Sequence, residues 1–338
     1  MNGANHRPSA LIELVSRALI ASSTSADNAA AVARALVAAE IDGQKGHGLS
    51  RVAAYAAQAR SGKVDGHAVP HLQATRMSSI MIDAANGFAY PALELAVREL
   101  PKLTRQSGIA AAGFARSHHA GAVGLVVEKM AAVGLIALMV SNTPQAMAAW
   151  GGRRGLFGTN PIAFAAPRLG GDALVIDLAL SQVARGKIMM AAQNGEAIAG
   201  GWAKDADGRP TVDAAAALQG TLMPMGGPKG AALALMVELM AAALTGANLA
   251  FQASSFFDAE GPPPGIGQLL IAVDPAAFGG EQAFAERLEL LANAIEEDGA
   301  RLPGAGRLLL REAAARDGIF VEHTVVAQLQ KIAAADSV

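Results

Sequence analysis

The chain has 338 residues, of which 52% are hydrophobic and 17% charged, so disorder is excluded as its main state. A net charge of −2 with no basic stripe argues against nucleic acid and anionic membrane surfaces as partners. The lack of cysteine excludes disulfides, thiolate catalysis and cysteine-ligated zinc. Because the opening MNGANHRPSALIELVSRAL does not have the pattern of a signal peptide, we expect a cytoplasmic protein.

The first part of the chain, residues 1–75, is expected to be largely helical. Apolar residues between Leu11 and Leu19 recur with a helical period. Ser25 is the expected N-cap of a second helix over residues 29–39. This part carries the candidate catalytic residues described below.

Residues 76–300 are expected to form an α/β domain, because short strand-like runs alternate with helical ones. Residues 301–338 then form a loop and a closing helix that returns to the first part. An α+β arrangement is the alternative. The predicted strands are 79–83, 108–114, 135–140 and 268–273, with a hairpin of 162–165 and 173–177; the predicted helices are 91–106, 123–133 and 282–297.

One segment, residues 230–251, is long and apolar enough to resemble a membrane span. Glu238 lies at its centre, and alanine and methionine are frequent around it. This composition favours a buried helix of a large core or of a subunit interface.

The stretch Lys45-Gly46-His47-Gly48-Leu49-Ser50-Arg51 is the strongest chemical signal. Histidine can exchange a proton near neutral pH, and arginine binds carboxylates through a planar fork. If the chain is helical from His47 onward, His47 and Arg51 share a face. The pair then suits an enzyme that acts beside the carboxylate of a small acid. A solvated helix face without function is the alternative.

The common enzyme motifs are missing. No G-x-G-x-x-G follows a predicted strand, and there is no Walker loop, H-E-x-x-H or G-x-S-x-G. The histidines do not pair with carboxylates at zinc spacing. A nicotinamide or nucleotide site would therefore need a different design.

Three glycine-rich stretches offer such a design, although each also fits an ordinary surface turn. Residues 117–122 follow a predicted strand and precede a helix, whose N–H groups can bind phosphate. Residues 150–161 form a loop rich in glycine and hydrogen-bond donors. Residues 226–230 open the long apolar helix and place Lys229 at its positive end, where an anionic ligand would offset the repulsion.

Taken in order, these blocks resemble the malate/L-lactate dehydrogenase-like oxidoreductases, a family distinct from the Rossmann-type lactate dehydrogenases. The resemblance covers roughly residues 10 to 310, and the segment Gly158-Thr159-Asn160-Pro161-Ile162-Ala163-Phe164 is its most specific part. The other matching pieces are Asp42-Gly43, His47-Gly48-Leu49, Arg51, Tyr55, Gly62, Ser117-His118-His119, Ser141-Asn142, Asp177-Leu178-Ala179, Ala184-Arg185-Gly186-Lys187, Gly201-Trp202, Lys229-Gly230 and Leu244-Thr245-Gly246-Ala247.

Within the family, the chain is most similar to the branch that reduces Δ1-piperideine-2-carboxylate and Δ1-pyrroline-2-carboxylate in proline, hydroxyproline and lysine catabolism. Residues 225–230, 254–257, 267–270 and 274–275 carry this finer resemblance. It implies reduction of a cyclic ketimine carboxylate to L-proline or L-pipecolate. It also implies a family-specific α/β fold with its own kind of nicotinamide-binding domain, no metal, and a homodimer with sites near the subunit boundary.

The resemblance also implies roles for single residues. His47 corresponds to the catalytic proton donor, and Arg51 and Thr159 to substrate contacts. NADPH is the implied cofactor, with NADH as the alternative. The implied cofactor-binding residues are His118, His119, Ala120, Gly121, Ala122, Asp177, Leu178, Ala179, Lys229, Arg301, Pro303, Gly304, Gly306 and Arg307.

Two positions depart from the family pattern. Many relatives have serine where this chain has Gly46, and Lys187 stands in the place of an aspartate that completes a Ser/His/Asp relay in some imine reductases. Such a relay cannot operate here, so other groups must orient His47 or another donor must serve. A dehydrogenase of 2-oxo and 2-hydroxy acids is the first alternative function, and a non-catalytic nucleotide-binding homologue is the second.

Overall fold

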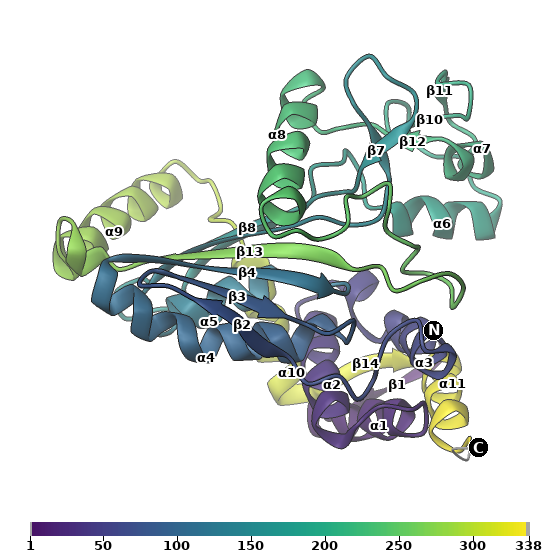
Figure 1. Cartoon of the computed structure of the whole chain (residues 1–338), viewed down its shortest axis with the longest axis horizontal. Coiled ribbons are helices and arrows are strands. Elements are labelled where there is room, and N and C mark those ends of the chain that lie inside the picture. The colour runs from purple at the N-terminus through teal and green to yellow at the C-terminus, as the bar shows by residue number, and fades with distance from the viewer. Residues whose placement is uncertain (1, 336–338) are drawn as a thin grey trace.

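The computed structural model describes residues 2–335; Met1 and residues 336–338, at the outer ends of the first and last expected parts, lie outside it. A seven-stranded sheet forms the centre of the fold. A helical region built from both ends of the chain lies at one end of it, and a lobe with a second, smaller sheet lies across one face (Figure 1). The α/β class predicted from the sequence is confirmed.

The large sheet has the strand order β2-β3-β4-β13-β5-β8-β9. Within it β3 and β4 run parallel, and the other neighbours are antiparallel. Strand β13 inserts between β4 and β5, so that Leu270 pairs with both Ala112 and Met139. The strands are β2 (His71–Thr75), β3 (Ser79–Asp83), β4 (Ile109–Ser117), β5 (Ile136–Ser141), β8 (Ile162–Ala166), β9 (Leu174–Leu178) and β13 (Ile266–Val273).

Helices α4 (Ala89–Ser107) and α5 (Gly124–Ala131) cover one face of this sheet (Figure 1). The strands present small side chains to them, among them Ala112 and Ala137, which lets the helices approach closely. The predicted strands, the β8–β9 hairpin and these two helices are confirmed to within a few residues. Helix α9 (Glu281–Glu297), also predicted, extends from the far end of the sheet.

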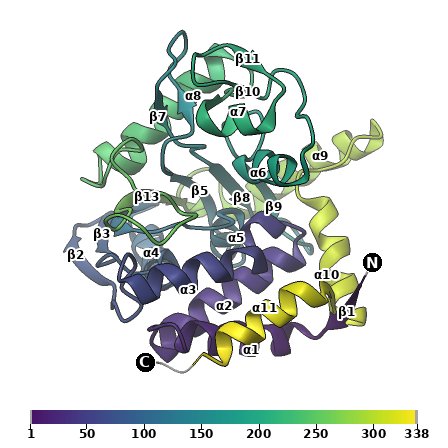
Figure 2. The same ribbon diagram turned by 90° about the vertical axis from the view of Figure 1, so that its right-hand side faces the viewer.

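Helices α1 (Pro8–Ile20), α2 (Ala26–Ile41) and α3 (Val52–Ser61) form the helical region together with the C-terminal segment (Figure 2). Ser25 caps α2 as predicted, since its Oγ accepts a hydrogen bond from the Asn28 N–H at 3.4 Å. Strand β1 (Gly3–His6) pairs with β14 (Ile319–Glu322), and neither strand was predicted. Helix α10 (Ala305–Asp317) precedes β14, and α11 (His323–Ala333) packs against α1.

The second lobe holds the smaller sheet, of order β11-β10-β12-β6-β7, with helices α6 to α8 around it (Figure 1). The sequence did not predict these short strands. The elements are β6 (Met147–Ala148), β7 (Gly155–Phe157), β10 (Ala203–Lys204), β11 (Pro210–Thr211), β12 (Thr221–Leu222), α6 (Arg185–Asn194), α7 (Ala214–Gln219) and α8 (Pro228–Glu238).

The long apolar stretch forms α8 and a π-helical turn, Leu239–Ala243, and is buried along one side only. Ala234 and Val237 lie in the core of the second lobe, whereas Met236 and Leu239 are exposed. Over residues 2–335, no helix is both long and apolar enough to cross a membrane.

Candidate active site

The turn that carries His47 is not a continuous helix, so the condition under which His47 and Arg51 would share a helix face is not met. Two short 3₁₀ turns, Lys45–His47 and Leu49–Arg51, are separated by Gly48, whose φ of −98° and ψ of −139° are not helical. The carboxylate of Glu40 accepts the Leu49 N–H at 2.9 Å. A Cβ on Gly48 would lie 2.2 Å from this carboxylate, so the close approach of Glu40 requires glycine here.

Arg51 ends the second turn and has unused hydrogen-bonding capacity. Its Nε donates to the Gly46 carbonyl at 2.6 Å, and its guanidinium carbon lies 4.6 Å from the centre of the Phe257 ring. Its Nη1 is buried and has no partner among the described residues. A buried guanidinium nitrogen without a partner is costly, and a bound carboxylate would supply one.

His47 lies beside this guanidinium in a largely buried position. Burial and, second, the charge of Arg51 lower the pKa of His47 to about 4, so the ring is neutral at pH 7. The Nδ1 atom is buried without a partner among the described residues. The ring stacks on that of His119, with centroids 5.1 Å apart and 26° between the planes.

Helix α3 holds the histidine pair that follows β4. The Tyr55 hydroxyl lies 2.6 Å from His119 Nδ1, and Gln58 Oε1 lies 2.9 Å from His118 Nε2. Phe256 packs on both imidazoles, at centroid distances of 5.1 and 5.0 Å. Burial is the main cause that lowers the pKa of His118 to about 3 and that of His119 well below its usual range. Both rings are therefore neutral and internal.

A segment around Phe257 closes this side of the site. Lys63, only 2% exposed, donates to the carboxylate of Asp258 at 3.0 Å and to its backbone carbonyl at 3.1 Å. Gln58 Nε2 donates to the same carbonyl at 2.8 Å. Neither Lys63 nor Asp258 was predicted as a site residue, because their contact spans 195 residues. Together they hold the phenylalanines against the histidines and Arg51.

The predicted cofactor residue Asp177 of β9 lies at the start of α5, directly after the predicted segment 118–122. Asp177 accepts the Gly124 N–H, at the start of α5, at 2.9 Å. Burial raises the pKa of Asp177, which the hydrogen bond from Gly124 and the charge of Arg307 oppose. Gly121, with φ of +66°, has no room for a Cβ because the Tyr90 hydroxyl would lie 2.4 Å from it. His118 to Ala122 are all buried.

The other predicted cofactor residues border the same region. Leu178 and Ala179 lead to Leu180, whose N–H donates to Thr159 O and whose carbonyl accepts from the Met225 N–H. Met225 precedes two glycines with positive φ and then Lys229, which is exposed in the first turn of α8. The C-terminal set, Arg301, Pro303, Gly304, Gly306 and Arg307, lies in and after the loop before α10.

These residues fit an anionic dinucleotide. Arg307 Nε is buried without a partner among the described residues, although its Nη2 donates to Glu128 at 3.0 Å. Gly226 and Gly227 have φ of +62° and +65°, which opens the backbone before Lys229 to close approach. The Lys229 ammonium after two glycines of positive φ, and separately the unpartnered Nε of Arg307, each suit a phosphate group.

Thr159 lies in a strained turn that a buried carboxylate fixes. The next residue, Asn160, has φ of +42°, and its Nδ2 donates to Glu238 Oε2 at 2.9 Å. Glu238 Oε1 accepts from Asn142 Nδ2 at 3.1 Å and from the Ala250 N–H at 2.6 Å. Thr159 itself contacts Thr143, whose Oγ1 accepts its N–H at 2.9 Å. No contact joins Thr159 to His47 or Arg51 among the described residues.

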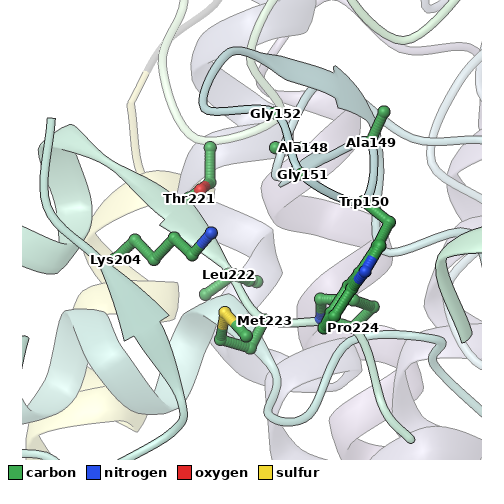
Figure 3. A pocket seen from close by; sticks show the side chains of 10 residues that line it. All are labelled: Ala148, Ala149, Trp150, Gly151, Gly152, Lys204, Thr221, Leu222, Met223 and Pro224. Carbon is green, nitrogen blue, oxygen red and sulfur yellow. The ribbon is translucent and has the colours of Figure 1, made fainter. Parts of the chain in front are cut away.

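A small hollow in the second lobe lies beside Gly227, where an added Cβ would come within 3.3 Å of the Trp150 ring that lines the hollow (Figure 3). Trp150 and Lys204 stand on opposite sides of it, with Met223 and Pro224 between them. Three of its ten lining residues, Trp150, Gly151 and Gly152, belong to the glycine-rich stretch 150–161, and none is among the predicted catalytic, substrate or cofactor residues. Across residues 2–335, no group of three histidine, aspartate or glutamate side chains could hold a metal ion.

Comparison with known proteins places this geometry in a family. The malate/L-lactate dehydrogenase family matches residues 7–330. A (2R)-3-sulfolactate dehydrogenase (NADP(+)) of Chromohalobacter salexigens is 52% identical over 280 residues, covering 82% of this chain and 83% of that protein. A Δ1-pyrroline-2-carboxylate/Δ1-piperideine-2-carboxylate reductase of Pseudomonas syringae pv. tomato is 40% identical over 325 residues, covering 96% and 94%.

A solved structure gives the same result for the fold. The Δ1-piperideine-2-carboxylate reductase from Pseudomonas syringae pv. tomato superimposes with a TM-score of 0.92 at 39% identity. The superposition covers 97% of this chain and 99% of that one.

Proposed function

The chain belongs to the malate/L-lactate dehydrogenase family, and we propose that it reduces a cyclic ketimine 2-carboxylate with NADPH. The observation that carries the proposal is the pairing of Arg51, with its buried and unpartnered Nη1, and the neutral imidazole of His47. A planar acid with a reactive nitrogen next to its carboxylate suits this pair. The ketimine reductases among the relatives, which match the chain nearly end to end, support the same substrate class.

In this mechanism Arg51 binds the substrate carboxylate and so fixes which face of C2 is presented. The bound carboxylate offsets the Arg51 charge, which is the second cause of the low pKa of His47. Substrate binding therefore raises the pKa of His47 and favours a proton on its ring. His47 then delivers this proton to the imine nitrogen.

The cofactor, when bound, supplies the hydride that C2 accepts. We propose that Lys229, Arg307 and the backbone around Gly226 and Gly227 hold its phosphates. We propose that residues 118–122 and Asp177 to Ala179 line the rest of the cofactor. NADPH is proposed over NADH because the 52% identical relative is an NADP(+) enzyme.

A second candidate, reduction of a 2-oxo acid to a 2-hydroxy acid, is favoured by that same relative, a sulfolactate dehydrogenase. Gly46 and Lys187, which stand where the imine reductases' relay has serine and aspartate, also support it. Arg51 would bind the carboxylate of either substrate, and His47 would protonate a carbonyl oxygen as well as an imine nitrogen. The two candidates differ in the atom that receives the proton.

Turnover of matched substrates tests the proposal. NADPH oxidation is followed with Δ1-pyrroline-2-carboxylate and Δ1-piperideine-2-carboxylate, and separately with pyruvate, oxaloacetate and 3-sulfopyruvate. We expect kcat/KM for a ketimine to exceed that for every oxo acid. A higher value for an oxo acid would establish the second candidate, and NADPH binding without any turnover would indicate a non-catalytic homologue.

We also propose that the protein is a homodimer. Large apolar side chains are exposed along α8 and the turn that follows it, including Met236, Leu239 and Leu244, which are 40%, 54% and 69% exposed. Such a row on one helix suits a second protein surface. Light scattering during gel filtration tests it: we expect twice the chain mass, and a monomer at micromolar concentration would contradict the proposal.

A further inference from the structure

The position of His47 is set by packing and not by a hydrogen bond to its ring. Its Nδ1 has no partner among the described residues, and Gly46 beside it has no side chain that could provide one. The stacked ring of His119 is the flat surface against which it rests. Whatever fixes His119 therefore also fixes His47.

His119 is fixed from two sides. The Tyr55 hydroxyl lies 2.6 Å from its Nδ1, and Phe256 packs on its ring. Tyr55 is fully buried, and Tyr90 lies behind it with the two hydroxyl oxygens 3.3 Å apart. The imidazole thus has an anchored nitrogen and an anchored face.

We propose that His119 is the positioning residue for His47 and that Tyr55 fixes the ring of His119. The inference rests on the proposed function, because it takes His47 as the proton donor. In this chain the Tyr55–His119 pair orients His47, because Gly46 replaces the serine that many relatives have beside this histidine.

The placement of Tyr55 explains why this arrangement keeps the donor aligned with the substrate. Arg51 immediately precedes α3, and Tyr55 lies four residues later, about one helical turn along. One short segment thus carries both the carboxylate clamp and the anchor of His119. A shift of α3 would move both together, so the carboxylate and the proton donor keep their relative positions.

The protons can be assigned along this chain of groups. Burial raises the pKa of Tyr55 to about 12 and that of Tyr90 well above its usual range, so both phenols keep their protons. The Tyr55 hydroxyl lies closer to His119 Nδ1 than to the Tyr90 hydroxyl, so we assign the Tyr55 proton to the hydrogen bond with Nδ1. His119 then carries its own proton on Nε2. Burial and, second, the charge of Arg51, which faces this cluster together with the rings of His47 and His118, keep His119 neutral.

Substitution of Tyr55 by phenylalanine tests the inference, because it removes one hydroxyl and keeps the ring. For Tyr55→Phe we expect kcat to fall about tenfold, the cost of one buried hydrogen bond, with KM within about twofold of wild type. Adding Tyr55→Phe to His119→Phe should lower kcat no further, since both changes break the same link. Multiplicative losses in the double variant, or equal losses in kcat and KM, would overturn the inference.

Thr104→Val provides a matched control. It also removes one buried hydroxyl, which donates to the Leu100 carbonyl at 2.9 Å on α4, away from the histidines. We expect it to lower the melting temperature and leave kcat and KM unchanged. A similar loss of kcat in this control would mean that the Tyr55 effect reflects stability alone.

A spectroscopic measurement separates failure of this inference from failure of the proposed function. The ¹⁵N resonances of histidine side chains report the protonated nitrogen of each ring in the unliganded protein. In Tyr55→Phe we expect the resonances of both His119 and His47 to move. Unmoved His47 resonances would overturn the inference even in an active enzyme, whereas moved resonances would support it even if neither substrate class turns over.

Discussion

Arg51 and Arg311 are two partly buried arginines of the same helical end of the molecule, and they use their nitrogens differently. Arg311 makes four hydrogen bonds of 2.6–2.8 Å to the carboxylates of Asp42 and Glu128. Arg51 makes one to a backbone carbonyl, rests on Phe257 and leaves Nη1 unpartnered among the described residues. Arg311 joins three helices, α2, α5 and α10, whereas Arg51 retains capacity for a ligand.

The hydrogen-bond partners of a buried arginine indicate whether it stabilises the fold or binds a ligand. A guanidinium that is satisfied by carboxylates contributes to the fold, because removing it leaves buried charges unpaired. A guanidinium that is buried, lacks a hydrogen-bond partner and lies next to a neutral histidine destabilises the unliganded protein, and a bound carboxylate would supply the missing partner.

The largest effect is expected from Arg51→Lys. The variant keeps the charge and loses the planar fork, so kcat/KM for the ketimine should fall about a hundredfold, or roughly 2–3 kcal/mol. Initial rates of NADPH oxidation measure it. An unchanged kcat/KM would refute the role of Arg51 as the carboxylate clamp.

Arg311→Lys is the matched change at the structural arginine. We expect the free energy of unfolding measured in urea to fall by about 2 kcal/mol, because a single ammonium cannot replace four hydrogen bonds to two carboxylates. KM for the substrate should stay at the wild-type value. A loss of substrate affinity without a loss of stability would erase the contrast between the two arginines.

Acid should destabilise the histidine cluster. The pKa values of His47 and His118 are lowered to about 4 and about 3, so the unfolded chain takes up these protons first as the pH falls. Stability is therefore complete above about pH 6.5 and decreases below it, by about 1.4 kcal/mol per pH unit for each ring. Urea midpoints between pH 7 and 4.5 measure this, and a His118→Gln variant should show a shallower slope. Identical slopes would contradict the assignment.

The smallest effect concerns the pH dependence of catalysis. The reduction rate should decrease as the pH rises through the pKa of His47, because the ring must carry a proton. Since the substrate carboxylate offsets Arg51, the pKa seen in kcat should exceed that seen in kcat/KM by about one unit. In Arg51→Lys the gap should remain, because the charge is kept. Equal values in the wild type would show that substrate binding does not change the proton affinity of His47.

Much of the fold could be predicted from periodicity, and the reasons for the failures are physical. Strands such as β3 and β5 are continuous apolar runs, and α9 has a clear start and period, so local sequence determines them. The pairing of β1 with β14 joins four-residue strands from opposite ends of the chain, which no local pattern reveals. The two-residue strands of the second lobe are equally short.

The site was predicted in part. His47 and Arg51 were singled out by their chemical types, and the structure places them side by side, although Gly48 interrupts the helix on which they would have shared a face. The contact of Tyr55 with His119 spans 64 residues, so no local spacing reveals it. Lys63 and Asp258 could not be found, because only the folded chain brings them together.

Whether Arg51 binds the substrate carboxylate can be tested by removing that carboxylate from the substrate. The measurement is kcat/KM for Δ1-pyrroline-2-carboxylate relative to carboxylate-free Δ1-pyrroline, in the wild type and in Arg51→Met. We expect Arg51→Met to lower this ratio about a hundredfold, because kcat/KM falls only for the substrate that carries the carboxylate. Equal decreases in both rates, with the ratio unchanged, would contradict it.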